Sequence, residues 1–95
     1  MLAKILKVYP LVQREFTAKD GSNQVFQSKK VALLFDSGSV VGELLQEKAA
    51  FYEQHPLHEH SQVFVQLHFQ YKEIPSRDGG TFISTEVIIQ KIVEL

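Results

Sequence analysis

Hydrophobic and polar residues alternate with a period of two along residues 63–72. Side chains of a β-strand point alternately to its two faces, so this run predicts a strand with one apolar and one polar face. A turn sequence follows at residues 75–80, which begins with Pro75 and ends with Gly79-Gly80, and a second β-rich run covers residues 81–95. The pattern therefore predicts a long antiparallel hairpin in the last third of the sequence.

Three further strands are predicted before this hairpin. Residues 3–16 are rich in apolar side chains, but the alternation changes phase near Pro10. Proline cannot donate a hydrogen bond to a neighbouring strand, so we expect one long first strand that is broken or bent there. The next turn contains Asp20-Gly21, a strong hairpin signal. Residues 24–36 then read as a second strand and residues 40–44 as a third.

Residues 45–54 have a different pattern. Leu45, Ala49 and Tyr52 are spaced as they would be on one face of an amphipathic helix of about two turns. Pro56 would end such a helix. A continued strand is the competing interpretation of this segment, and residues 55–61 form a polar connector in both cases.

The predicted order is strand, strand, strand, short helix or loop, strand, strand. This is the element order of the OB-fold, an all-β, five-stranded Greek-key barrel in which the helix or loop lies between strands three and four. A small SH3-like barrel is the main rival, although its strands are usually shorter. The 95 residues predict one domain that covers residues 1–95.

Composition narrows the classes of function. Seven Phe and three Tyr predict a core of aromatic and β-branched residues, and the absence of Cys excludes disulfides and cysteine-based zinc sites. No apolar run is long enough for a signal peptide or a membrane span, so we expect a cytoplasmic protein without a membrane partner. A net charge of −1 gives no bulk attraction to nucleic acid. Any such binding therefore requires charges that are sorted locally.

Cations and aromatic residues gather in and beside the two predicted hairpin turns. OB-folds commonly bind oligonucleotides on strands two and three and on these two loops, with cations meeting phosphates and aromatic rings stacking on bases. We predict stacking on Phe26, with Tyr71 and Phe82 as further candidates, and phosphate contacts from the cations. The alternative is that Phe26 packs under its hairpin and the lysines are merely solvated. The candidate binding residues are Arg14, Phe16, Lys19, Phe26, Lys29, Lys30, Tyr71, Lys72, Arg77 and Phe82.

Three segments carry a resemblance to a known family: a first strand with lysine and valine (residues 4–8), a loop followed by an aromatic residue (residues 19–26) and the closing hairpin turn (residues 77–82). This layout resembles the single-stranded DNA-binding proteins of filamentous phages, the gene V protein type, although no motif matches residue for residue. The resemblance implies a homodimer that coats single-stranded DNA cooperatively and without sequence preference, with Phe26 as a stacking residue. Those relatives tend to be richer in tyrosine and arginine, and this chain has a helix-like segment at residues 45–54.

Other chemistries have weaker signals. His55, His58 and His60 with Glu59 could supply zinc ligands, but no second cluster of ligands exists in the sequence, so a solvated loop is the preferred interpretation. The serines lack a G-x-S-x-G setting, and no glycine-rich segment carries the lysine of a P-loop. We therefore expect neither an enzyme nor a bound cofactor.

The sequence thus predicts a protein that binds single-stranded nucleic acid, with DNA as the expected ligand and RNA as the alternative, and the resemblance implies that it is a homodimer. The competing function is a protein-interaction or assembly module on the same barrel, in which the aromatic residues anchor a partner protein. An exposed Phe64 and a surface of mixed charge with an apolar patch would favour that module. A continuous positive groove would favour nucleic acid.

Overall fold

The structure, a computed structural model, describes residues 1–95. The elements along the chain are β1 (Leu2–Val8), β2 (Val12–Thr17), β3 (Asn23–Phe35), β4 (Gly38–Leu45), α1 (Glu47–Gln54), β5 (Gln62–Pro75) and β6 (Thr81–Glu94). The predicted break in the first strand is confirmed, because β1 and β2 lie on either side of Pro10. The predicted order of strands, with a helix before the final hairpin, is also confirmed.

The six strands form one sheet that closes on itself. Their order is β1-β5-β6-β4-β3-β2, and an additional pairing of β1 with β3 completes the circle. When β1 and β2 are counted as one broken strand, the result is a closed barrel of five strands. β4 and β6 meet in parallel at Glu43 and Ile88. Gly42 permits this approach, because a Cβ atom there would lie 2.7 Å from Cγ1 of Ile89.

The core is built from aliphatic side chains that alternate along the barrel strands. The fully buried residues include Ile5, Leu33, Leu44, Val65 and Ile89. The predicted β-branched residues of the core are confirmed, since buried Ile and Val side chains dominate it, but none of the seven phenylalanines is buried, so the aromatic part of that prediction is wrong. Branched aliphatic side chains fill the interior of the barrel, and Phe35 and Tyr52 pack against this core from partly buried positions.

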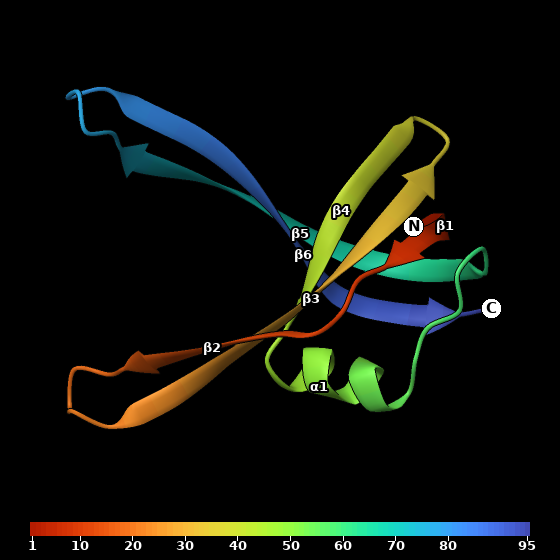
Figure 1. Cartoon of the computed structure of the whole chain (residues 1–95). Helices are drawn as coiled ribbons and strands as arrows, with labels where there is room; N and C mark the ends of the chain where they lie inside the picture. Colours follow the sequence, from red (N-terminus) through yellow and green to blue (C-terminus); the bar gives the residue numbers. More distant parts are fainter.

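Two hairpins continue past the barrel as projecting ribbons (Figure 1). Residues 12–28 of β2 and β3 form the short arm, and residues 68–88 of β5 and β6 form the long arm. Both project to the same side of the molecule in Figure 1. The radius of gyration is 15.4 Å, whereas a compact chain of this length has about 12 Å. The arms therefore stand away from the core, and most of the predicted binding residues lie on them.

Helix α1 lies beneath one end of the barrel (Figure 1). It is anchored by the fully buried Ala49 and by the hydroxyl of Tyr52, which donates a hydrogen bond to the carbonyl oxygen of Ile92 at 3.0 Å. The helix confirms that residues 45–54 do not continue as a strand, although Leu45 is the last residue of β4 and the helix starts at Glu47. With eight residues, α1 is too short to span a membrane.

Candidate nucleic-acid interface

A groove of about 650 Å³ lies between the two arms, with β4 as its floor. Four of the predicted binding residues line it: Arg14, Phe16 and Phe26 from the short arm and Lys72 from the long arm. The structure thus brings Lys72 beside residues that lie far earlier in the sequence, such as Arg14. The full lining consists of Arg14, Glu15, Phe16, Phe26, Glu43, Leu45, Gln70, Lys72, Glu86 and Ile88.

Strand register explains why the short arm faces this groove. Arg14 pairs with Phe26 across β2 and β3, and residues directly opposite each other in an antiparallel pair share a face. The same face of β3 continues to Lys30, which lies opposite Glu43 of β4. The aromatic face of the short arm is therefore continuous with the outer face of the barrel at β4.

The long arm has two different faces. Lys72 pairs with Ser84 and Ile74 with Phe82, which places Phe82 on the groove side of the ribbon, where it is 65% exposed. Tyr71 pairs with Thr85 and therefore lies on the opposite face. Tyr71 is highly exposed, but it points away from the groove, because neighbouring residues of a strand point to opposite faces. The prediction that Tyr71 lies on one binding surface with Lys72 and Phe82 is therefore wrong.

The remaining predicted cations of the hairpins lie at the tips of the arms. Lys19 is in the turn of the short arm, and Arg77 is in the turn of the long arm. Gly21 and Gly79, two residues further on in each turn, have φ values of 85° and 86°, a region that favours glycine. Both tips therefore present a cation on a tight, glycine-dependent turn.

A carboxylate follows each of these cations and stays ionised. The hydroxyl and the backbone N–H of Ser22 both donate to Asp20, and these hydrogen bonds lower the pKa of Asp20. The hydroxyl of Ser76 and the backbone N–H of Gly80 donate to Asp78 and lower its pKa in the same way. The charges at each tip therefore cancel locally. The adjacent ionised aspartate weakens the attraction of each tip cation for a phosphate.

Lys29 is not part of the groove. It is only 6% exposed, and its ammonium nitrogen lies 2.6 Å from Oε2 of Glu53 on α1. This hydrogen bond lowers the pKa of Glu53 and ties the helix to β3. Alternation along β3 points Lys29 inward and Lys30 outward. The predictions that Lys29 meets phosphates or is solvated are both at odds with this burial, whereas Lys30 is exposed.

Two lysines that sequence reasoning did not select lie on the outer face of β1. Lys4 is opposite Leu34 and Lys7 is opposite Ala32, which places both on the same face of the sheet as Lys30. The ammonium of Lys7 is 5.1 Å from the ring centre of Tyr9. Simple alternation would separate positions 4 and 7, but an irregularity between Ile5 and Lys7 shifts the register. No local sequence signal marks that irregularity.

Comparison with known proteins identifies the fold. The structure is similar to the solution NMR structure of the second OB-fold domain of replication protein A from Methanococcus maripaludis, with a TM-score of 0.58. The two sequences are 24% identical, and the match covers 99% of this chain and 79% of the other. The chain has an OB-fold. No model of a known protein family and no curated protein matches it.

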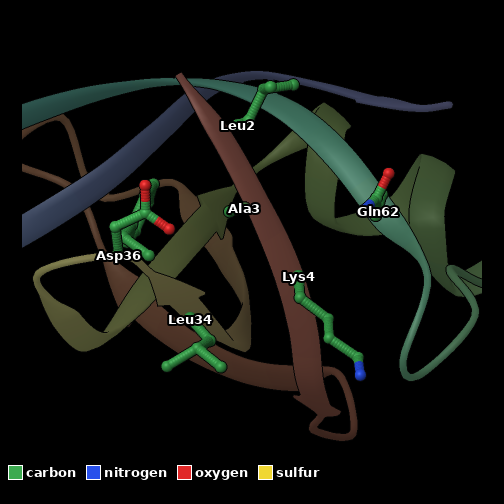
Figure 2. Close-up of a pocket in the computed structure, with 7 residues that line it drawn as sticks. Leu2, Ala3, Lys4, Leu34, Asp36 and Gln62 are labelled. Atoms are coloured by element: carbon green, nitrogen blue, oxygen red, sulfur yellow. The ribbon is translucent and has the colours of Figure 1, made fainter.

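A second hollow of the OB-fold, of about 340 Å³, lies where β1 separates from the end of β3. Figure 2 shows the Lys4 side chain of β1 extending away from Asp36, while Leu34 and Leu2 contribute aliphatic surface. The two charged groups form no ion pair. Because few polar groups converge there, we assign no ligand to this hollow and regard Lys4 as part of the outer face of β1.

The histidine-rich connector of the OB-fold is tied to the barrel. Nδ1 of His58 lies 3.0 Å from Oε2 of Glu94, and the backbone N–H of Val8 donates to Glu59 at 3.1 Å. No group of three histidine, aspartate or glutamate side chains is placed to hold a metal ion. The connector therefore links β1, β6 and the start of β5.

Proposed function

We propose that this OB-fold binds single-stranded nucleic acid, DNA in the first instance, in the groove between its two arms. The observation that carries the proposal is the meeting of the exposed Arg14 and Phe16 with the half-buried Phe26 on one face beside β4. This is the surface that OB-folds commonly use for oligonucleotides. The role is one of binding and not of catalysis.

Exposed aromatic rings provide the stacking surfaces. Phe16 is 46% exposed on the short arm and Phe82 is 65% exposed on the long arm, both on the faces turned to the groove. Stacking of a base on such a ring contributes roughly 1–3 kcal/mol and tolerates any sequence, because every base has a flat π-face. Stacking of unpaired bases on these exposed rings would therefore stabilise the complex.

Phosphates would be met at the rim of the groove and not at its centre. Arg14 and Lys30 on the short-arm side, the tip residues Lys19 and Arg77, and the outer-face residue Lys7 make no ion pair within the chain. Each phosphate contact on a single strand is expected to change the logarithmic salt dependence of binding by about −0.7. Binding through these cations should therefore weaken as salt is added.

The setting that we propose is DNA replication. The similar solved structure is a domain of replication protein A, and this chain shares its fold over nearly the whole of its length. Kinship with the gene V protein type, a homodimer, a single domain covering residues 1–95 and a cytoplasmic location remain predictions from the sequence. Light scattering over a range of protein concentrations tests the homodimer.

The experiment measures fluorescence anisotropy of a labelled single strand of mixed sequence and about 16 nucleotides, near the upper site size of one OB-fold. Titrations at about 50 and 200 mM salt should give an affinity that falls with salt. Phe26→Ala should weaken binding by about one order of magnitude, as expected for one lost stacking contact. Phe16→Ala should act in the same direction.

Phe51→Ala is the matched control. Phe51 is 52% exposed, close to the 46% of Phe16, but it lies on α1 and outside the groove. Its replacement should leave the affinity unchanged. The proposal fails if no binding is detected at low salt, or if Phe51→Ala and Phe26→Ala have the same effect.

A second candidate, a protein-interaction module, is favoured by the far face of the long arm. Phe69, Tyr71 and Ile83 are 56%, 70% and 74% exposed on that face, and Phe64 on β5 is 44% exposed. The groove also contains acids as well as cations, so it is not a continuous positive channel. These observations support a protein partner on the outer face of the arm, which could coexist with a nucleic acid in the groove.

A further inference from the structure

Charges of both signs line the groove that we propose as the nucleic-acid site. Arg14 and Lys72 contribute two cations, whereas Glu15, Glu43 and Glu86 contribute three carboxylates. A phosphate placed at the centre would meet these carboxylates at short range, where like charges repel strongly. A single strand in this groove must therefore turn its bases towards β4 and its phosphates towards the rim.

One of the carboxylates already has its partners. Oε1 of Glu86 lies 2.7 Å from the ammonium nitrogen of Lys72, and Oε2 accepts a hydrogen bond of 2.7 Å from the side-chain amide of Gln70. The contact with Lys72, followed by that with Gln70, lowers the pKa of Glu86. Both oxygens of Glu86 are thus engaged, and this residue has little capacity left for a ligand.

Glu43 and Glu15 have no such partners, and of these two only Glu43 lies on the β4 floor of the groove. It is half-buried on the outer face of β4, opposite Lys30, yet it forms neither an ion pair nor a side-chain hydrogen bond. Its two neighbours on the groove floor are apolar: Leu45 lies two residues further along β4, and Ile88 is the β6 residue with which Glu43 pairs. Glu43 is therefore a free hydrogen-bond acceptor beside an apolar surface that is formed by Leu45 and Ile88, the apolar seat.

A base that covers this seat removes water from the Glu43 carboxylate. Such desolvation is unfavourable unless the base donates a hydrogen bond in return. Cytosine and adenine carry an exocyclic amino group that can donate, whereas thymine presents the O4 carbonyl at the corresponding position. Uracil carries the same carbonyl. Carboxylates accept from the amino group of cytosine in known modes of base recognition.

We propose that Glu43 gives the groove a preference for bases that carry an exocyclic amino group over thymine and uracil. The inference rests on the proposed binding of single strands and adds the class of base that the site favours. The base would lie on Leu45 and Ile88, and its amino group would donate to the Glu43 carboxylate. The preference concerns composition, so the protein would still coat strands of many sequences.

The test compares labelled oligo-dC, oligo-dT and oligo-dU of equal length by fluorescence anisotropy at mildly alkaline pH, where cytosine is unprotonated. The wild-type protein should bind oligo-dC about tenfold more tightly than the other two, in line with the discrimination that a good side-chain-to-base contact provides. Oligo-dU separates the carbonyl from the methyl group of thymine. If uracil behaves like cytosine, the methyl group causes the difference and the inference is overturned.

Glu43→Gln should reduce the ratio of the dC and dT affinities to about one, because an amide can either donate or accept. Glu47→Gln on α1 removes the same charge outside the groove and should leave the ratio at its wild-type value. Thermal melting of both variants verifies that they are folded. A cytosine preference that survives Glu43→Gln, or its absence in the wild type, overturns the inference while the proposed function stands. Failure of every oligonucleotide to bind overturns both.

Discussion

The two arms end in the same turn. Lys19-Asp20-Gly21 and Arg77-Asp78-Gly79 have the same order of cation, aspartate and positive-φ glycine, although they are far apart in the sequence. The closing backbone hydrogen bonds also correspond: Ala18 donates to Ser22 at 2.8 Å, and Ser76 donates to Gly80 at 2.9 Å. Each turn needs a glycine in the left-handed region and an acceptor for free backbone N–H groups, and the two sequences meet these needs alike.

The ribbons behind these turns differ. The short arm places an unpaired Arg14 next to Phe26, whereas the long arm ties Lys72 to Glu86 and has the more exposed apolar side chains, up to 74% for Ile83. An unpaired cation beside an aromatic ring is suited to both the phosphate and the base of a nucleotide. The long arm, whose cation is neutralised, offers a ring for stacking on its groove face and an apolar surface for packing on its far face. Two hairpins with nearly identical turns can therefore differ in the chemistry of their strands.

The largest effect is expected from the two faces of the long arm. Phe82→Ala, on the groove face, should weaken binding of a mixed-sequence single strand by about one order of magnitude through the loss of stacking. Tyr71→Ala, on the opposite face, should leave that affinity unchanged. Anisotropy titrations measure both variants. An equal loss of affinity in both variants would show that the nucleic acid does not bind to one face of the long arm in preference to the other.

A smaller effect separates the free cation from the paired one. Arg14→Gln should reduce the steepness of the logarithmic salt dependence by about 0.7, the contribution of one phosphate contact. Glu86→Gln should make it steeper, because Lys72 is then released to meet a phosphate. Lys48→Gln on α1 serves as the control for a lost positive charge outside the groove. The comparison breaks down if Arg14→Gln and Lys48→Gln have equal slopes.

The smallest effect concerns the two matching turns. The folded-state pKa values of Asp20 and Asp78 are lowered, so their contribution to stability is present above their unfolded pKa, near 4, and is lost as the pH falls. Asp20→Asn and Asp78→Asn should each lower the free energy of unfolding at pH 7, and the loss should be smaller at about pH 3. Denaturant unfolding at both pH values checks this. Unequal losses would show that the turns are not equivalent.

Local patterns predicted much of the fold. The break at Pro10, the two glycine-containing turns and the alternation of the final hairpin are short-range features, since they depend on φ restrictions and on which face a side chain occupies. They were sufficient to order the elements and to identify the OB-fold. The pattern does not define the start of the helix, because Leu45 fits the apolar face of a helix as well as the end of a strand.

The candidate site depended more on contacts between distant segments. Lys29 and Lys30 are indistinguishable by composition, yet one is buried against Glu53 and the other is exposed, because α1 packs on only one face of β3. Lys4 and Lys7 share a face only because the register of β1 shifts between them. Neither effect has a local signal in the sequence.

The sequence by itself determined the elements, their order and the chemistry of the two tips, because these follow from backbone restrictions over a few residues. Only the tertiary structure decided which cations are free and that Glu43 stands unpaired between Leu45 and Ile88. The close approach of β4 and β6 at Gly42 creates that seat. Closure of a barrel fixes neighbours that are distant in the chain, and a charge is available to a ligand only when those neighbours leave it unpaired.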